Sequence, residues 1–104
     1  MAYSIYQIVL YRFPLKEVEY PRPCVIVQIA KDGTLAILPI STKTYGNDEK
    51  FAIHIDHPDF AATGLTDTSY VHGFPVLDIP PSWVLKTLGT LKGDMKKKFI
   101  NWIV

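Results

Sequence analysis

An arginine held between two prolines is the first feature of this sequence that suggests chemistry. Arg22 lies in the segment PRP at residues 21–23. A proline restricts φ at its own position and favours an extended backbone at the residue before it. We therefore expect a stiff loop that presents the Arg22 guanidinium, whose fork of donors suits a phosphate. The alternative is an ion pair with Glu17 or Glu19 that only braces the loop.

Two hydroxyl side chains and a lysine form a second candidate group. Ser41, Thr42 and Lys43 follow directly after an apolar run that ends at residue 40. Hydroxyl groups at the end of a strand can bind a phosphate oxygen or the edge of a nucleobase. They can equally satisfy backbone groups of the turn, which is their commoner use. Lys43 adds a positive charge that attracts phosphate, although most exposed lysines only increase solubility.

Histidines supply the candidate proton-transfer groups. The segment HIDH at residues 54–57 has a spacing that suggests a metal, but no third ligand follows at a spacing typical of zinc sites, so we predict no metal. His72 follows Tyr70 by two residues, and the alternation of a strand places both side chains on one face. Histidine can transfer protons near neutral pH. A single histidine is nevertheless more often an ordinary surface or core residue.

Composition limits the classes of protein that these residues can serve. The chain has 104 residues, 48% hydrophobic and 20% charged, which predicts one packed domain over residues 1–104. The net charge of +1 argues against a general basic surface for nucleic acid. Cys24 is the single cysteine, so no disulfide can form within the chain, and we expect a buried side chain and a cytoplasmic protein. We find neither a membrane-spanning run nor a secretory signal.

Most of the chain has the pattern of short β-strands. We predict strands at residues 4–13, 24–29, 34–40, 51–55, 69–72 and 75–79. The Asp32-Gly33 pair favours a tight turn, so the second and third strands should form an antiparallel hairpin.

Two helices are predicted near the end of the chain. Residues 82–88 follow two prolines and precede Gly89, as in a short capped helix. A last helix begins at residues 93–94 with Asp94 as N-cap, and its apolar face consists of Met95, Phe99, Trp102 and Ile103. The fold expected is a small, mainly β barrel or twisted sheet of about five to seven antiparallel strands with a C-terminal helix.

The order of several short motifs resembles the MazF/PemK family of toxins from type II toxin–antitoxin systems. RPCVIV at residues 22–27 is followed by LPIST at 38–42 and by LGTL at 88–91, and the likeness extends from about residue 8 to 103. The resemblance implies an SH3-like barrel of the CcdB/PemK superfamily and a homodimer that an antitoxin blocks. It also implies growth inhibition by a metal-independent endoribonuclease without cofactor, in which the 2′-hydroxyl of single-stranded RNA attacks its own phosphate.

The same resemblance suggests which residues would bind RNA. Arg22 falls on the loop arginine of the family and Ser41-Thr42 on its Thr-Ser pair. Ribonuclease members also carry an arginine and an acid on a later strand, but residues 68–77 here contain neither. Tyr70 and His72 occupy the matching face. Either His72 replaces the acid–base group while Arg22 supplies the cation, or the chain binds without cutting.

Two other functions remain open from the sequence. A non-catalytic SH3-like module that binds protein or peptide would use a concave face lined by Tyr45, Phe51 and Trp83. A gyrase-directed inhibitor like the CcdB branch would present apolar residues of the last helix, Trp102 and Ile103 among them. More often such residues pack on the core of so small a domain.

Overall fold

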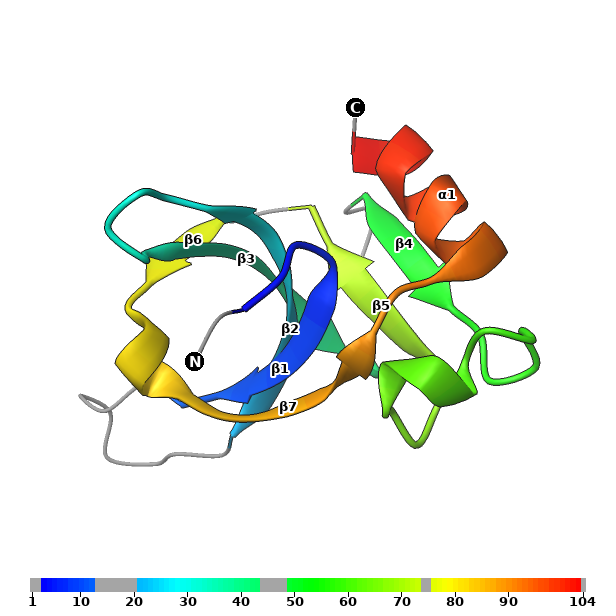
Figure 1. Cartoon of the computed structure of the whole chain (residues 1–104). Coiled ribbons are helices and arrows are strands. Elements are labelled where there is room, and N and C mark those ends of the chain that lie inside the picture. Colours follow the sequence, from blue (N-terminus) through cyan, green and yellow to red (C-terminus); the bar gives the residue numbers. More distant parts are fainter. Residues whose placement is uncertain (1–2, 13–20, 44–48, 74–75, 104) are drawn as a thin grey trace.

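A computed structural model describes residues 3–12, 21–43, 49–73 and 76–103. These residues form a seven-stranded antiparallel sheet and one C-terminal helix, which confirms the mainly β fold class (Figure 1). The strand order is β4-β5-β3-β2-β1-β7, and β6 pairs with β3 beside this path. The bounds are β1 Gln7–Tyr11, β2 Arg22–Ile29, β3 Leu35–Ser41, β4 Lys50–Ile53, β5 Ser69–His72, β6 Leu77–Ile79, β7 Val84–Thr90 and α1 Gly93–Ile103.

The antiparallel hairpin that the sequence predicts is confirmed as β2–β3, and it forms the centre of the sheet. Its turn is stabilised by the Asp32 carboxylate, which accepts the backbone N–H of Thr34 at 2.9 Å. Gly33 has a φ of 93°, a conformation that favours glycine. Further along the hairpin, the register shifts between Ile26 and Gln28, so that β2 has a bulge at Val27.

Both faces of the central strands are buried, each in its own hydrophobic cluster. Alternate residues of a strand point to opposite faces, so neighbours in sequence enter different clusters. The first cluster lies under α1, β4 and β5, and its buried members include Ile8, Val25, Leu38, Val71 and Phe99. The second lies on the other face of these strands, and its buried members, from β1, β2, β3 and β6, include Val9, Cys24, Ile26, Leu35, Ile37 and Ile79. Two small cores therefore share one set of strands.

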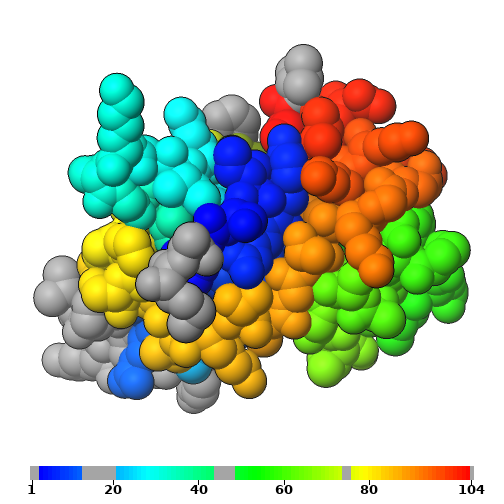
Figure 2. Space-filling model, in the orientation of Figure 1, coloured from blue at the N-terminus to red at the C-terminus, as the bar shows by residue number. Residues whose placement is uncertain are grey.

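Helix α1 packs its apolar face on the first cluster. Phe99 is fully buried and makes edge-to-face ring contacts with Tyr6 at 6.0 Å and Phe51 at 5.3 Å between centroids. In the space-filling view, the N-terminal segment lies between the cyan part of the hairpin and the orange-red helix (Figure 2). Asp94 lies in the first helical turn rather than at the N-cap as predicted. The carboxylate that accepts a free N–H there, from Met95 at 3.2 Å, belongs to Asp59.

The prediction of a helix at residues 82–88 is wrong. The structure has a single 3-10 turn, Pro81–Trp83, followed by strand β7, Val84–Thr90. Pairing with β1 along its length, from Gln7 opposite Thr90 to Tyr11 opposite Val84, overrides the weak local preference for a helix. Gly89 is not a helix cap but a point of close approach, since a Cβ there would overlap the carbonyl oxygen of Ala62.

The first strand is shorter than predicted. It begins at Gln7 because Tyr6 has a φ of 72°, outside the extended region. The fourth strand ends at Ile53, two residues earlier than predicted. Among the described helices, none has the length and apolar character that crossing a bilayer requires.

Candidate functional site

Three of the predicted site residues lie in two cross-strand pairs of the sheet. Arg22, at the start of β2, is directly opposite Tyr11 at the end of β1. Ser41, at the end of β3, is directly opposite Tyr70 of β5, which in turn is opposite Ala52 of β4. Paired residues of neighbouring strands point to the same face of a sheet. The pairing therefore places Tyr11 and Arg22, and likewise Ser41 and Tyr70, on a common face.

The β2–β3 hairpin relates these two pairs to one another. Cys24 pairs with Pro39, and both Arg22 and Ser41 lie two residues beyond this pair toward the open end of the hairpin. The pairing of β2 with β3 ends at Cys24 and Pro39, and the alternation of side chains places Arg22 and Ser41 on the same face beyond this last pair. We call Tyr11, Arg22, Ser41 and Tyr70 the cross-strand row.

Arg22 occupies the first position of a strand and not the loop predicted for it. Its backbone belongs to the β1–β2 ladder, and its side chain is exposed. Burial raises the pKa of the neighbouring Tyr11 phenol, and the coulombic influence of Cys24 adds to this rise, whereas the positive charge of Arg22 opposes it. Glu17 and Glu19, the alternative partners from the sequence, lie outside the described residues.

The hydroxyl group of Ser41 performs the turn role that the sequence left open. Its Oγ accepts the backbone N–H of Lys43 at 3.1 Å, and the hydroxyl keeps its own proton to donate. Thr42 and Lys43 are both exposed, directly beyond the end of β3. The strand end thus offers hydroxyl groups and an ammonium group beside the exposed guanidinium of Arg22.

Tyr70 and His72 share a face of β5, but they differ in exposure. Tyr70 is half-buried in the row, while His72 is only 7% exposed and lies opposite Lys50 of the edge strand β4. His72 therefore lies on the same face of β5 as Tyr70 but is more deeply buried. Of the two side chains, Tyr70 is the one that a ligand on this face meets first.

Cys24 lies on the same face of β2 as Arg22. It is fully buried in the second cluster, and burial raises the pKa of its thiol to about 12. The thiol therefore stays protonated at neutral pH. The prediction that Cys24 is a small buried hydrophobic residue is confirmed.

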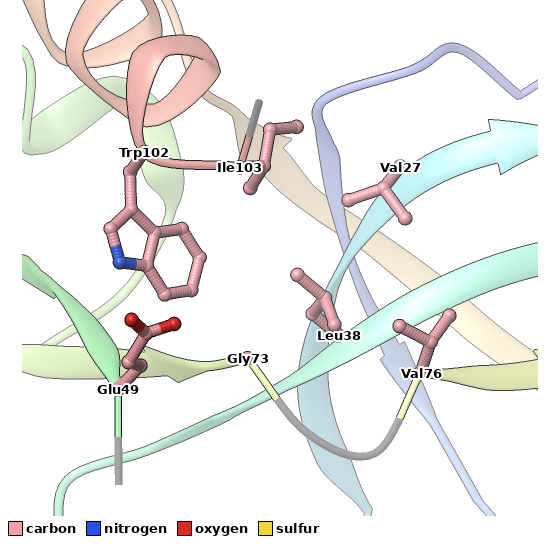
Figure 3. A pocket seen from close by; sticks show the side chains of 7 residues that line it. All are labelled: Val27, Leu38, Glu49, Gly73, Val76, Trp102 and Ile103. Atoms are coloured by element: carbon pink, nitrogen blue, oxygen red, sulfur yellow. The ribbon is translucent and has the colours of Figure 1, made fainter.

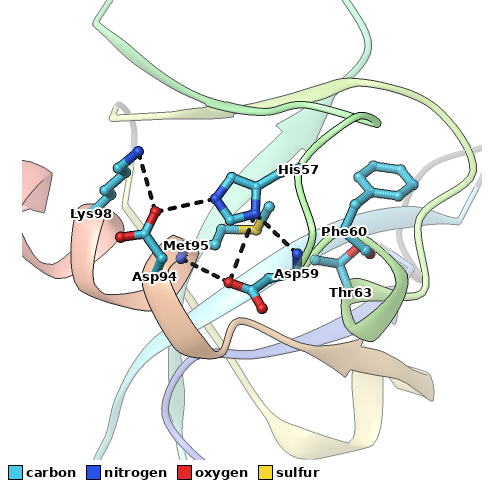
Figure 4. A network of polar contacts seen from close by, with 7 residues as sticks. All are labelled: His57, Asp59, Phe60, Thr63, Asp94, Met95 and Lys98. Carbon is cyan, nitrogen blue, oxygen red and sulfur yellow. Dashed lines mark hydrogen bonds and ion pairs between the residues drawn. The ribbon is translucent and has the colours of Figure 1, made fainter.

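A second group of polar residues joins the segment after β4 to helix α1 (Figure 4). Nδ1 of His57 accepts the backbone N–H of Asp59 at 3.0 Å, and its Nε2 lies 3.3 Å from Oδ2 of Asp94. Lys98, one turn further along α1, contacts the same oxygen at 3.2 Å. The Nε2 contact thus joins the segment after β4 to α1, while the Nδ1 contact is local to that segment. In the part of the chain that the structure describes, no group of three or more His, Cys, Asp or Glu side chains could hold a metal ion.

The aromatic residues that a binding module would use do not share a face. Phe51 packs against the first cluster, beside Phe99 and Trp102, whereas Trp83 packs against the second. Tyr45 lies outside the described residues. Trp102 is likewise partly buried on the first cluster.

The sequence pattern does not predict that Tyr11 lies beside Arg22. In the sequence, Tyr11 is one of several aromatic residues in an apolar strand. Only the β1–β2 register places it beside Arg22. A sequence signal for this pair would require knowledge of strand register, which the loop between the two strands does not supply.

Comparison with known proteins identifies the family of this chain. The model of a family described as PemK-like, MazF-like toxin of type II toxin–antitoxin system matches residues 4–100. The match covers all four residues of the cross-strand row, as well as Thr42, Lys43 and His72. No curated protein sequence matches the chain.

Proposed function

The chain belongs to the PemK-like, MazF-like toxins of type II toxin–antitoxin systems, and from this premise we propose that it is an endoribonuclease that cuts single-stranded RNA without a metal ion. The observation that carries the proposal is the cross-strand row. It combines an exposed guanidinium, hydroxyl groups and an aromatic ring on one face. Phosphate contacts with hydroxyl and cationic groups, combined with stacking of bases on aromatic rings, are typical of proteins that bind single-stranded RNA.

Arg22 is the proposed anchor of the scissile phosphate. In the reaction, the 2′-oxygen forms a bond to phosphorus while the bond from phosphorus to the 5′-oxygen breaks. The products are a cyclic phosphate and a 5′-hydroxyl end. Negative charge develops on the phosphate oxygens, and a guanidinium placed against them stabilises this charge more in the transition state than in the ground state.

Ser41, Thr42 and Lys43 are the proposed contacts to neighbouring phosphates or base edges. The Ser41 hydroxyl proton is available to donate, because the Oγ acts as an acceptor toward Lys43 N–H. Tyr70, opposite Ser41, is the proposed stacking platform for a base.

The proton transfers are assigned to His72. One proton leaves the attacking 2′-hydroxyl and one must reach the departing 5′-oxygen. His72 is the histidine on the face of Tyr70, two residues away along β5. Because His72 is 7% exposed, this role requires the nucleotide to reach it past Tyr70.

The proposal extends to partners and location by family membership. We propose a homodimer, a cognate antitoxin that blocks the RNA site, growth inhibition when the antitoxin is absent, and action in the cytoplasm. The one cysteine, reduced and buried, is consistent with a reducing compartment. Light scattering coupled to size exclusion would test the dimer, and a monomer at micromolar concentration would contradict it.

A second function has one observation in its favour. The burial of His72, together with the absence of arginine and acid from β5, favours a member that binds a protein without cutting RNA. In that case the cross-strand row would bind anionic groups of a protein partner.

One experiment separates the two functions. A labelled RNA mixture that covers all short sequences is incubated in EDTA with the wild type, Arg22→Ala and His72→Gln. Lys86→Ala and His54→Gln, exposed residues outside the row, serve as matched controls. Selective cuts that survive in both controls and disappear in both test variants support the ribonuclease. A folded wild type that leaves every RNA intact excludes it and leaves the binding module.

A further inference from the structure

A hollow lies beside the point where β1 ends and β7 begins. It has a volume of about 270 Å³ and is lined by Arg12, Ser82, Trp83 and Leu85. Ligand pockets in proteins commonly start at about 300 Å³, so this hollow has room for one small group rather than for a folded element. Much of its wall comes from the 3-10 turn η2, Pro81–Trp83, and we therefore call it the η2 pocket.

The backbone holds the walls of the η2 pocket in place. The N–H of Trp83 donates to the carbonyl oxygen of Pro80 at 3.1 Å and closes the turn. The carbonyl oxygen of Trp83 accepts the N–H of Arg12 at 3.1 Å, which ties the turn to the end of β1. Proline at residues 80 and 81 fixes φ at both positions, so the turn has few other conformations. The pocket is therefore formed before a ligand binds.

A bulge in β7 adds an apolar wall to the pocket. Leu10 of β1 is opposite Lys86, and the next residue, Tyr11, is opposite Val84. Leu85 is thus the extra residue between two pairs, as in a β-bulge. Its side chain lines the pocket and is 52% exposed.

The lining side chains suit a nucleotide. Arg12 is exposed, and the planar fork of donors on its guanidinium matches the oxygens of a phosphate. The indole of Trp83 is partly buried against the second cluster and offers a flat surface on which a base can stack. The exposed hydroxyl of Ser82 both donates and accepts hydrogen bonds. Among the described lining residues there is no Asp or Glu, so no carboxylate in the pocket repels a phosphate.

The η2 pocket adjoins the cross-strand row at its β1 end. Tyr11 is opposite Arg22 of β2 on one side and opposite Val84 of β7 on the other. Neighbouring strands are about 4.8 Å apart, so roughly 10 Å separate the backbones at Arg22 and Val84. Trp83 and Val84 both pack against the second cluster, to which Tyr11 belongs. The indole of Trp83 therefore lies on the same side of the sheet as the row.

We propose that the η2 pocket binds one nucleotide of the RNA whose scissile phosphate lies at Arg22, with its phosphate on Arg12 and its base on Trp83. The inference rests on the proposed RNA-cutting function and adds a subsite to it, so that the RNA extends from β5 across the hairpin to β7. An acidic peptide also suits Arg12. A nucleotide, however, uses the guanidinium, the hydroxyl and the indole together, whereas a carboxylate needs only the first.

Binding of RNA that cannot be cut tests the pocket apart from catalysis. Mixed-sequence oligonucleotides of about eight nucleotides, within the usual site sizes of single-strand binding folds, carry 2′-O-methyl groups and so lack the attacking hydroxyl. The chain has two tryptophans, and Trp102→Phe leaves Trp83 as the only one. We expect the oligonucleotide to quench the fluorescence of Trp83 in this background, because a stacked base lies against the indole.

Matched variants separate the phosphate contact from the base contact. Arg12→Ala should weaken binding about tenfold and reduce the slope of log Kd against log salt by about 0.7, the value for one phosphate contact on a single strand. Lys97→Ala, which removes an exposed charge on α1, should change neither. Trp83→Leu should also weaken binding about tenfold but leave the slope unchanged. Trp83→Phe should keep most of the affinity, because a phenyl ring also stacks.

RNA that can be cut gives a second readout. In single-turnover assays, Arg12→Ala should raise the half-saturating protein concentration about tenfold and leave the rate at saturation unchanged. The reason is that a nucleotide beside the reacting phosphate is bound equally in the ground state and in the transition state. Arg22→Ala should instead lower the rate at saturation. Arg12 is exposed, so its variant should fold.

Three results would overturn the inference. These are unchanged fluorescence of Trp83 on RNA binding, equal affinities of the wild type and Arg12→Ala, and equal losses for Arg12→Ala and Lys97→Ala. If Arg22→Ala slows cleavage while Arg12→Ala has no effect, the proposed function stands and only the η2 pocket is excluded. If the wild type binds no RNA, both fail. Binding of a glutamate-rich peptide that Arg12→Ala abolishes would then assign the pocket to a protein partner.

Discussion

The two ends of the β2–β3 hairpin carry surfaces of opposite character. At the open end, the cross-strand row presents Arg22, with Lys43 just beyond Ser41. Toward the turn, Asp32 and Asp78 line a hollow of negative character. The two surfaces lie on opposite faces, because Ser41 continues the face of Ile37 and Pro39 while Leu38 and Ala36 point the other way. One pair of strands therefore keeps the positive side chains at the row apart from these carboxylates.

Each face of the hairpin rests on a different hydrophobic cluster. Leu38 and Trp102 line an apolar hollow beside α1, and both belong to the packing of the first cluster (Figure 3). The row continues from Cys24 and Ile26, which belong to the second. Core substitutions should therefore affect the two faces unequally, and this difference is open to measurement.

The largest effect is expected from Phe99→Ala. Phe99 is fully buried and contacts Trp102, which lines the apolar hollow, at 5.7 Å between ring centroids. Loss of the ring leaves a cavity, and we expect the free energy of unfolding to fall by about 3–5 kcal/mol. Urea denaturation measures this, with the exposed Asn101→Ala as control. A loss below about 1 kcal/mol would show that α1 is not anchored by this residue.

Next comes Arg22→Ala, which tests the row without a change in either cluster. Removal of the proposed phosphate anchor should reduce the single-turnover rate of RNA cleavage about 100-fold, the usual result of deleting one group that stabilises developing charge. Arg22→Lys should recover only part of this rate, because lysine lacks the planar fork. Unfolding by urea should be unchanged, since the side chain is exposed. An unchanged rate would remove Arg22 from the mechanism.

Cys24→Ser is expected to have a smaller effect and acts on the second cluster. A serine hydroxyl in place of the buried thiol needs a hydrogen-bond partner within an apolar cluster. A buried hydroxyl without a partner costs about 1–3 kcal/mol of stability. Cys24→Ala is the matched variant without a polar group. If serine proves as stable as alanine, this face of β2 is more open to water than its burial indicates.

The smallest effect is expected from Asp94→Asn, at the polar group beside α1. Hydrogen bonds from Lys98 and His57 lower the pKa of the Asp94 carboxyl in the folded protein. A lowered pKa stabilises the fold at pH values above the ordinary pKa of the carboxyl, and this contribution is lost as the pH falls through the folded value. The melting temperatures of wild type and variant should therefore differ slightly at pH 7 and converge in acid. A difference that grows in acid would contradict the assignment.

Local sequence patterns were sufficient where the structure depends on near neighbours. The Asp32-Gly33 turn, the hairpin around it and the buried Cys24 all follow from a few adjacent residues. The apolar spacing of Met95 and Phe99 likewise predicted the buried face of α1. The pattern failed at residues 84–88, because their conformation depends on pairing with β1, about 75 residues earlier.

The sequence by itself determined the fold class, the hairpin and the residue types of the candidate site. Tertiary structure alone decided that Ser41 lies opposite Tyr70 and Arg22 opposite Tyr11, and that Arg12 and Trp83 line one pocket next to this row. The physical reason is strand register. A shift by one residue would turn every side chain to the other face, and the register of distant strands is set by burial of both clusters together. Local propensity carries no information about that choice.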